Sequence, residues 1–255
     1  MKKAIGIVGG VGPYAGLDLN KKIFDNMKTN GTDQDYLDVY LVSQSSDITD
    51  RSTYLKTKEG ANPAEGLFRA ALKLNNLGAA VIAIPCNTAH SFTIFDRVKE
   101  LMRLAGCKAK LLNIVEETHK FLEENHSNIE KIGLLGTLGT YDTKLYENYF
   151  NKMGKFELVN PSVDGKQNVH NAIYNLDFGV KAVSSPVTLE AKQLFEKEID
   201  SFLDNKVQSV ILGCTEIPLA FNNESFYKQA SLIDPTNILA RALIKYSNEN
   251  YLKSI

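Results

Sequence analysis

The chain carries one glycine-rich pattern twice, once in each half. Residues 5–14 read IGIVGGVGPY and residues 132–141 read IGLLGTLGTY, with one Ile, three Gly and one Tyr identical at an offset of 127. Since the chain has 255 residues, this offset is about half of its length. The repeat predicts two copies of one α/β unit, related by a pseudo-two-fold axis, whose strands end at a shared crevice.

Two of the three cysteines follow nearly the same offset. Cys86 and Cys214 stand 128 residues apart, in the segments AVIAIPCNTAH and SVILGCTEIPLA, and each comes at the exit of an apolar run. We therefore expect the two cysteines to occupy the same position in the two copies and to approach the crevice from opposite sides. Cys107, in MRLAGCKAK, is not followed by small polar residues as the other two cysteines are, and it is interpreted as a small buried structural residue.

Apolar runs rich in Ile, Val and Leu alternate with longer stretches of helical periodicity, which is typical of βα units. The predicted fold class is α/β, with two similar parallel-sheet domains and an active site in the cleft between them. Because most of the runs are apolar throughout, they indicate buried parallel strands. The predicted strands are residues 4–8, 37–42, 80–84, 110–114, 131–135, 156–159, 207–212 and 231–233.

Helical spacing predicts helices at residues 64–77 and 184–203, the second of which begins with the helix-start signal Ser-Ser-Pro. A further helix, capped by Thr236, is expected at the C-terminus and is assigned to the first domain. The predicted domains are residues 1–115 plus 222–255, and residues 116–221.

Composition and charge narrow the classes of function. With 29 basic and 30 acidic residues and a formal net charge of −1, the chain has no electrostatic footprint for nucleic acid or an anionic membrane. The N-terminal apolar run breaks at Gly9-Gly10, too early for a signal peptide or membrane span, so a cytoplasmic location is expected. Three cysteines without CxxC spacing favour neither a disulfide framework nor a zinc site. A small molecule is the expected partner.

The glycine loop after the first strand resembles a dinucleotide-binding turn only in part. GGVGPYAG lacks the G-x-G-x-x-G spacing, and the second predicted strand ends without the Asp or Glu that would bind a ribose. A strand-to-helix turn that brings backbone N–H groups close to a small anionic ligand fits better. We expect Gly10 to serve this purpose in the first half and Thr137, which adds a hydroxyl group, in the second.

A cysteine between a strand and a helix is well placed for thiolate chemistry, because the helix N-terminus lowers the pKa of the thiol. Asn87 and Thr88 follow Cys86, and Thr215 and Glu216 follow Cys214; all four side chains can hydrogen-bond a carboxylate or an amine. Two thiols across a crevice can remove a proton from one face of a carbon and return one to the other. Amino-acid racemisation without a pyridoxal cofactor is then chemically accessible, as are redox chemistry and acyl transfer.

Histidines offer little further chemistry. His90 lies four residues after Cys86, where it could tune the thiol, although a structural role as a cap or support is the preferred interpretation. His119, His126 and His170 lie in polar helical or loop sequence and receive no functional role.

The combination of GIVGGVGP, IPCNTAH, GLLGT and GCTEIPL resembles the aspartate/glutamate racemase superfamily over essentially the whole chain, in the family's order. The glutamate racemase branch carries an Asp-Ser-Gly-x-Gly-Gly loop and a His after the second Cys-Thr pair; this chain has Gly9–Pro13 and Glu216 instead, as in the aspartate racemase branch. The resemblance implies two similar α/β domains, a cofactor-independent two-base mechanism with catalytic Cys86 and Cys214, and a homodimer.

The resemblance also implies a basic pair that engages the side-chain carboxylate of the substrate. ITDRSTYL supplies Arg51 and FGVKAVSS supplies Lys181, and the two stand 130 residues apart, close to the repeat offset. An Arg grips a carboxylate with two parallel hydrogen bonds, and a Lys adds a point charge. Lys166, in VDGKQNVH, is the rival assignment for the lysine.

The leading hypothesis is a racemase that interconverts L- and D-aspartate without a cofactor, with glutamate as a second candidate substrate. Some members of this branch have Thr in place of the first cysteine, whereas this chain keeps both, which favours racemisation in both directions. Alternatives within the superfamily are a broad-specificity amino-acid racemase, a hydantoin racemase and a maleate-isomerase-like enzyme. A different class is a non-catalytic two-domain protein that closes on a small acid.

Overall fold

The computed structural model describes residues 3–126 and 128–255, which form two compact units. The first unit extends to Thr118 and resumes at Thr236, and the second is His119–Pro235, so the division falls inside helix α5 (Ile114–Asn125). Residues 222–235, predicted to belong to the first domain, lie in the second unit. The physical reason is that strand β9 (Ala230–Ile233) in this segment pairs with strand β7 (Ser209–Gly213) of the second sheet.

Both units are built on parallel strands in the same order. Over the described residues, the first sheet has the order β2-β1-β3-β4 and the second has the order β6-β5-β7-β9-β8, with only β8 antiparallel. Each of the predicted strands overlaps an observed one, and the two-residue strand β8 was not predicted. The remaining strand bounds are β1 (Ile5–Gly9), β2 (Val39–Ser43), β3 (Val81–Ala83), β4 (Lys110–Leu111), β5 (Lys131–Gly136), β6 (Glu157–Val159) and β8 (Phe226–Tyr227).

The internal repeat is visible in the register of the central strands. Gly6 of β1 lies beside Ile82 of β3, and its repeat partner Gly133 of β5 lies beside Val210 of β7. The two halves of the sequence therefore fold into the same parallel arrangement, and residues that follow β3 and β7 at equal distances occupy equivalent positions in their own sheets.

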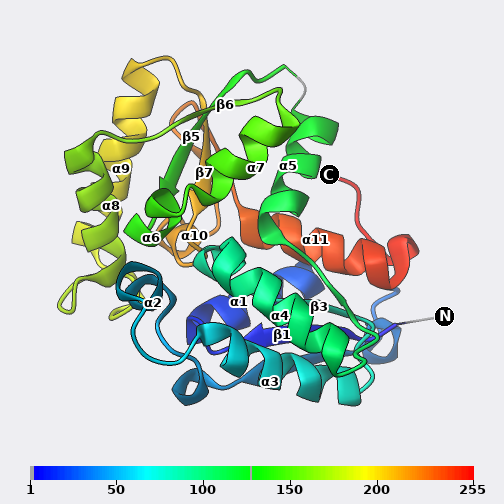
Figure 1. Cartoon of the computed structure of the whole chain (residues 1–255). Helices are drawn as coiled ribbons and strands as arrows, with labels where there is room; N and C mark the ends of the chain where they lie inside the picture. The colour runs from blue at the N-terminus through cyan, green and yellow to red at the C-terminus, as the bar shows by residue number, and fades with distance from the viewer. Residues whose placement is uncertain (1–2, 127) are drawn as a thin grey trace. The chain divides into compact units, whose positions relative to one another are not determined.

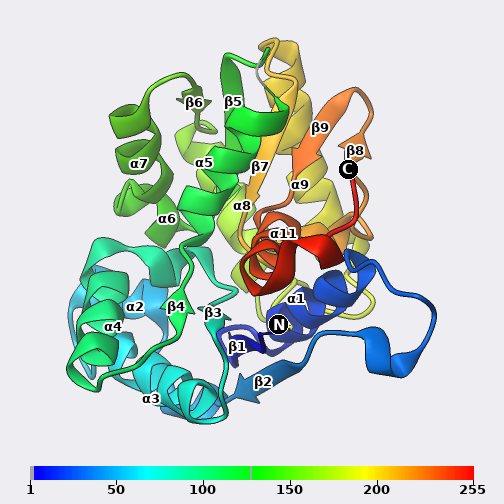
Figure 2. The same ribbon diagram turned by 90° about the vertical axis from the view of Figure 1, so that its right-hand side faces the viewer.

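The first unit has helices on both faces of its sheet (Figure 1). Helix α3 packs on β1 and β2 and against α4, whose side chains join the same buried cluster, and α1 also packs on β1 and β2. Helix α11 lies beside α1 (Figure 2), where Asn26 donates a hydrogen bond to Asn237 at 2.7 Å. The helices of this unit are α1 (Pro13–Asp25), α2 (Arg51–Thr57), α3 (Pro63–Asn76), α4 (Phe92–Leu104) and α11 (Pro235–Asn248).

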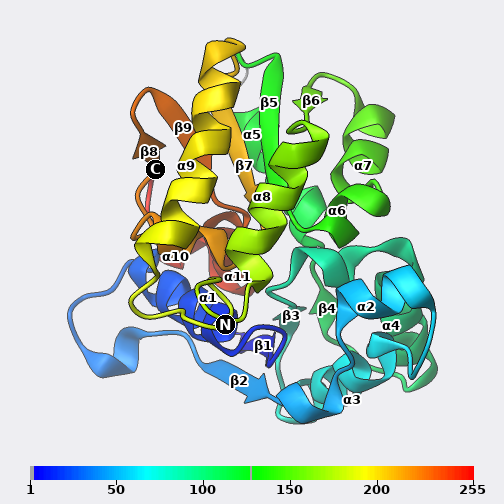
Figure 3. The ribbon, with the colours of Figure 1, turned by 90° about the vertical axis from the view of Figure 1, so that its left-hand side faces the viewer.

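In the second unit, α8 and α9 pack on each other and on β5, and Figure 3 shows them side by side across one face of the sheet. Helix α9 begins at Leu189 rather than at the predicted Ser184, because the hydroxyl of Thr188 caps it by accepting from Ala191 N at 3.2 Å. The remaining bounds are α6 (Leu138–Asp142), α7 (Leu145–Met153), α8 (Val163–Tyr174), α9 (Leu189–Asp204) and α10 (Ile217–Ala220).

Two other helix predictions can be compared with the structure. Helix α3 spans Pro63–Asn76, within one residue of the predicted range, and the Asn62 side chain caps it by accepting from Ala64 N at 2.9 Å. Helix α11 starts at Pro235, so Thr236 lies in its first turn and is not its cap residue as predicted. Within residues 3–126 and 128–255, none of the helices is both long and apolar enough to pass through a membrane.

The repeated glycines Gly6 and Gly133 have a packing role. A Cβ atom on Gly6 would lie 3.0 Å from the side chains of Ala79 and Ile82, and one on Gly133 would lie 2.7 Å from the ring of Phe202. Interiors are packed too densely to accept an added carbon at such distances. Identity at these positions therefore reflects the close approach of other segments to each central strand.

We expect Gly133→Ala to lower the free energy of unfolding of the second unit by about 1–3 kcal/mol, because the added methyl overlaps the ring of Phe202. Urea denaturation followed by circular dichroism measures the change. Gly16→Ala is the matched control, since a Cβ there has its nearest neighbours at an ordinary 3.4 Å. Phe202→Leu in the Gly133→Ala background should recover part of the loss, and an unchanged stability of Gly133→Ala would contradict this packing role.

Candidate functional site

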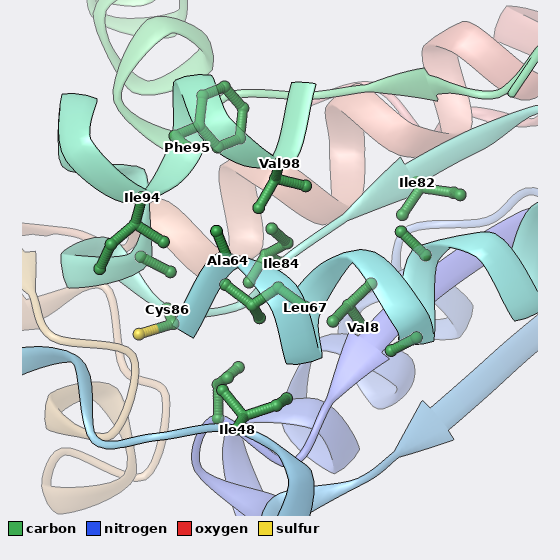
Figure 4. Close-up of a cluster of buried hydrophobic side chains, with 14 of the residues drawn as sticks. Val8, Ile48, Ala64, Leu67, Ile82, Ile84, Cys86, Ile94, Phe95 and Val98 are labelled. Atoms are coloured by element: carbon green, nitrogen blue, oxygen red, sulfur yellow. The ribbon is translucent and has the colours of Figure 1, made fainter. Parts of the chain in front are cut away.

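Cys86 ends a row of apolar side chains that begins in strand β3. Ile82, Ile84 and Cys86 point to the same side of the strand and belong to one buried cluster with side chains of α3 and α4, including Leu67. Figure 4 shows Cys86 at the end of this cluster, with its sulfur directed away from Leu67. Cys86 is 7 % exposed. Packing therefore fixes the carbon atoms of this side chain and leaves its sulfur at the edge of the core.

The backbone after Cys86 turns through the short 3-10 helix η3 (Asn87–His90) into α4. His90 is buried, and its Nδ1 lies 2.9 Å from the carbonyl oxygen of Cys86. Burial lowers the pKa of His90 from its ordinary 6.5 to about 4, against the effect of backbone hydrogen bonds, so the imidazole is neutral at pH 7. A neutral ring donates from Nδ1 to the Cys86 carbonyl, which supports the structural interpretation of His90.

Other predicted ligands of the first unit lie near the same edge of its sheet. Gly10 directly follows β1, with φ of 81°, and a Cβ there would lie 2.7 Å from the backbone nitrogens of Gln44 and Ser45. Arg51 is buried at the first position of α2, a helix that contacts η3. Asn87 and Thr88 are also buried, 3 % and 5 % exposed. Gly10 thus follows β1, Arg51 follows β2, and Asn87 and Thr88 follow β3.

Cys214 ends an equivalent row in the second unit. Val210, Leu212 and Cys214 belong to one buried cluster with side chains of α8 and α9, such as Ala172 and Phe195. Cys214 follows β7 directly and is 6 % exposed. Because Ile82 and Val210 occupy equivalent strand positions and each cysteine comes four residues later, the two sulfurs belong to the same place in the two copies.

The surroundings of Cys214 differ from those of Cys86 because they contain an ion pair. The thiol of Cys214 donates to Glu216 Oε2 at 3.1 Å, and the hydroxyl of Thr215 donates to the same oxygen at 3.2 Å. The other oxygen, Oε1, accepts a hydrogen bond from the Lys181 ammonium. Both carboxylate oxygens of Glu216, whose side chain is 3 % exposed, are therefore occupied within this unit.

The pKa values of this cluster follow from its burial and charges. Burial first, and the charge of Glu216 second, raise the pKa of Cys214 well above its ordinary value, while Lys181 opposes them. Burial disfavours the charged form of Lys181, but the adjacent carboxylate of Glu216 opposes it and raises the pKa of the ammonium. Cys214 is thus a neutral thiol hydrogen-bonded to a carboxylate.

The segment between α8 and α9 holds Lys181 beside Glu216 by backbone hydrogen bonds. Val180 N donates to Ala172 O at 2.9 Å and Lys181 N donates to Ile173 O at 3.1 Å, so this segment folds back onto the last turn of α8. Nζ of Lys181 also lies 5.6 Å from the centroid of the Tyr174 ring. These contacts position a lysine 35 residues away from its carboxylate partner in the sequence.

Thr137 and Tyr141 complete the same edge of the second sheet. Thr137 caps α6 by accepting from Thr140 N at 3.2 Å. Tyr141 OH donates to Leu134 O at 3.0 Å and accepts from Gly136 N at 2.8 Å, and burial raises its pKa, so it is neutral. Sequence reasoning missed Tyr141, although its identity in the repeat was the available signal.

The remaining sequence predictions can be located as well. Lys166, the rival to Lys181, lies in the first turn of α8 with its Nζ 4.9 Å from the centroid of the Tyr141 ring. Cys107 lies between α4 and β4, packed against the core of the first unit, and burial raises the pKa of its thiol. Among the described residues, no three His, Cys, Asp or Glu side chains are grouped so that they could hold a metal ion.

The chain is similar to known racemases over most of its length. The sequence pattern of the Asp/Glu/Hydantoin racemase family matches residues 8–243. The chain is 26% identical to a glutamate racemase of Staphylococcus carnosus over 98% of this chain and 85% of that protein, and 22% identical to the broad specificity amino-acid racemase RacX of Bacillus subtilis over 94% and 96%. The structure is similar to Picrophilus torridus aspartate racemase, with a TM-score of 0.78 and 25% identity over 98% of this chain and 96% of that one.

The lowered pKa of His90 predicts a pH dependence of stability. Between pH 6.5 and about 4 the unfolded chain binds a proton at this residue and the folded chain does not, so stability falls as the pH drops through this window. The His90 contribution is at most about 3 kcal/mol.

We expect His90→Asn, whose amide can replace Nδ1–H as a donor, to lose this part of the acid destabilisation. Urea denaturation at pH 7 and pH 5 measures it, with wild type as the reference. His126→Asn provides the comparison: burial also lowers the pKa of this half-buried histidine, so its substitution should remove a smaller part of the acid destabilisation. An identical pH dependence in wild type and His90→Asn would contradict a buried neutral His90.

Proposed function

Because the chain belongs to the Asp/Glu/Hydantoin racemase family, we propose that it is an amino-acid racemase that interconverts L- and D-aspartate with Cys86 and Cys214 as its acid–base pair. The observation that carries this proposal is the equivalence of the two cysteines, each four residues beyond a paired position of the repeated central strands. An acid and a base that exchange roles with the direction of reaction suit two chemically identical groups.

The proposed reaction consists of two balanced proton transfers. A thiolate on one face of the substrate removes the proton from Cα and becomes a thiol, and the electron pair of the broken C–H bond is delocalised into the adjacent carboxylate. The thiol on the other face then donates its proton to Cα and becomes a thiolate. The centre is inverted and the two cysteines have exchanged protonation states, without a pyridoxal cofactor.

The remaining predicted residues bind the substrate in this proposal. Arg51 and Lys181 engage the side-chain carboxylate, as the family resemblance implies. The second carboxylate and the amine of the substrate are bound by Gly10, Asn87, Thr88, Thr137 and Thr215. Glu216, which the sequence also predicted to bind substrate, has both carboxylate oxygens occupied by Cys214, Thr215 and Lys181. Buried hydrogen-bonding groups of this kind orient a small ligand and select against molecules that leave them unpaired.

Aspartate is preferred over glutamate because of the Gly9–Pro13 loop and the Glu after the second Cys-Thr pair, both of which depart from the glutamate racemase pattern. The similarity to an aspartate racemase structure supports this choice. Glutamate is the second candidate, supported by the similarity to a glutamate racemase along 98% of the chain. Comparison of the initial racemisation rates of the two amino acids distinguishes these candidates, and equal rates on several amino acids would identify a broad-specificity racemase.

The two single-cysteine variants should each handle one enantiomer. In Cys214→Ala the thiol of Cys86 can remove and return a proton on one face only, so in D₂O it should exchange the Cα hydrogen of one aspartate enantiomer without inverting it. Cys86→Ala should do the same for the other enantiomer. Proton NMR of the Cα position measures exchange, and chiral chromatography measures inversion.

Racemisation in both variants should fall by several orders of magnitude, since groups that act as a unit do not contribute additively. Cys107→Ser is the matched control and should keep the wild-type rate. Racemisation that survives in the Cys86→Ala, Cys214→Ala double variant would contradict the mechanism, and failure to exchange any small acid would favour a binding protein over an enzyme.

Arg51→Met should raise KM for aspartate about tenfold or more, because a charge-assisted hydrogen bond to the side-chain carboxylate is lost. Alanine, which has no such carboxylate, provides the internal comparison in steady-state kinetics. Arg69→Met is the control variant, since Arg69 is half exposed and pairs with Asp47. If Arg51→Met affects the turnover of aspartate and alanine equally, Arg51 does not bind the side-chain carboxylate of the substrate.

A further inference from the structure

Glu216 was predicted to bind substrate, yet the structure gives its carboxylate a different set of contacts. One oxygen accepts from the thiol of Cys214 at 3.1 Å and from the hydroxyl of Thr215 at 3.2 Å, and the other accepts from Lys181. The side chain is 3 % exposed, and Cys214 is 6 % exposed. A buried carboxylate is retained in a protein only where such partners compensate for its lost hydration.

We propose that Glu216 is a positioning residue that holds Cys214 as a thiol at rest and accepts its proton when Cys214 has to act as a base, with Lys181 fixing the carboxylate in place. This inference rests on the proposed function, because it concerns the acid–base role of Cys214. It assigns Glu216 to the cysteine rather than to the substrate.

The charges around the cluster support this assignment. Lys181 is the cation that donates to Glu216, and its Nζ lies 5.6 Å from the centroid of the Tyr174 ring. Tyr141, which also interacts electrostatically with Cys214, is neutral because burial raises its pKa. Burial favours the thiol of Cys214 most strongly; beside it, the anion Glu216 also favours the thiol and the cation Lys181 favours the thiolate.

The proton transfer is balanced without an external reagent. When Cys214 acts as a base, the S–H proton moves along the existing hydrogen bond to Oε2 of Glu216, which gives a thiolate beside a neutral carboxylic acid. The Lys181 ammonium then stabilises the thiolate instead of the carboxylate. After the thiolate has taken a proton from the substrate, Glu216 returns its own proton to solvent, and the Cys86 thiolate left by the reaction takes one up.

Cys86 has a different immediate environment in its own unit. It is followed by the neutral side chains of Asn87 and Thr88, and its carbonyl faces His90, which is neutral at pH 7. Helix α2, which contacts η3, begins with the cation Arg51 and carries Lys56 in its last turn. The two halves of the repeat thus supply unlike environments, and the cysteine that a carboxylate holds as a thiol at rest is Cys214.

Steady-state efficiency cannot reveal this difference. L- and D-aspartate have equal free energies, so kcat/KM must be the same for the two enantiomers whichever cysteine is protonated at rest. The ionisation of the Cys214 thiol must therefore be measured directly, in protein without substrate.

The test uses a Cys86→Ala, Cys107→Ser background, in which Cys214 is the remaining cysteine. The ultraviolet absorbance of the thiolate is recorded against pH. Glu216→Gln removes the negative charge and should lower the titration midpoint of Cys214 by about one pH unit or more. Lys181→Met removes the positive charge and should raise the midpoint by a similar amount. Lys192→Met is the control, since Lys192 pairs with Glu196 on α9, and should leave the midpoint unchanged.

Opposite shifts in the two variants support the proposal, because a merely structural role would not move the midpoint in both directions. No shift, or shifts of the same sign, would overturn it. The side chain of Lys181 is 22 % exposed, so we expect Lys181→Met to fold even if Glu216→Gln does not. A raised midpoint in Lys181→Met would then support the proposal, and an unchanged or lowered one would overturn it. The titration needs no substrate: if the shifts occur but wild-type protein racemises no amino acid, the proposed function fails and the Cys214–Glu216 pairing stands.

Discussion

The structure depends on the packing of one central strand in each sheet, β3 in the first and β7 in the second. Alternation along β3 and β7 puts Ile82 and Ile84, and likewise Val210 and Leu212, in rows that pack against helices, and each row ends in a cysteine. A row of this kind fixes the carbon atoms of its last side chain while the strand end leaves the sulfur near polar groups. The same packing that stabilises each sheet therefore positions its thiol.

Duplication of this arrangement provides two equivalent thiols, and the residues that directly follow each cysteine give the two thiols different surroundings. The chain places Asn87 and Thr88 after the first cysteine and Thr215 and Glu216 after the second. Proton transfer to and from Cα requires one group that begins as base and one that begins as acid. A carboxylate beside only one of the two equivalent cysteines is a simple way to set these starting states.

Strands, helices and the equivalence of the cysteines could be predicted from the sequence because they depend on local periodicity and on a visible repeat. The ion pair between Lys181 and Glu216 could not, since it depends on how the segment after α8 is held by hydrogen bonds to Ala172 and Ile173. Residue identity alone suggested that both side chains bind substrate. The membership of residues 222–235 in the second unit was missed for a related reason, because strand pairing is a non-local interaction.

The central claim is that the two cysteines act as separate bases from opposite faces of the substrate. Racemisation of L-aspartate by the wild-type protein in D₂O, stopped early, tests it most directly through the isotope content of both enantiomers. We predict deuterium at Cα of the D-aspartate formed and essentially none in the remaining L-aspartate, because a different group delivers the returning proton. Equal early labelling of both enantiomers would indicate a single base and contradict the two-cysteine mechanism.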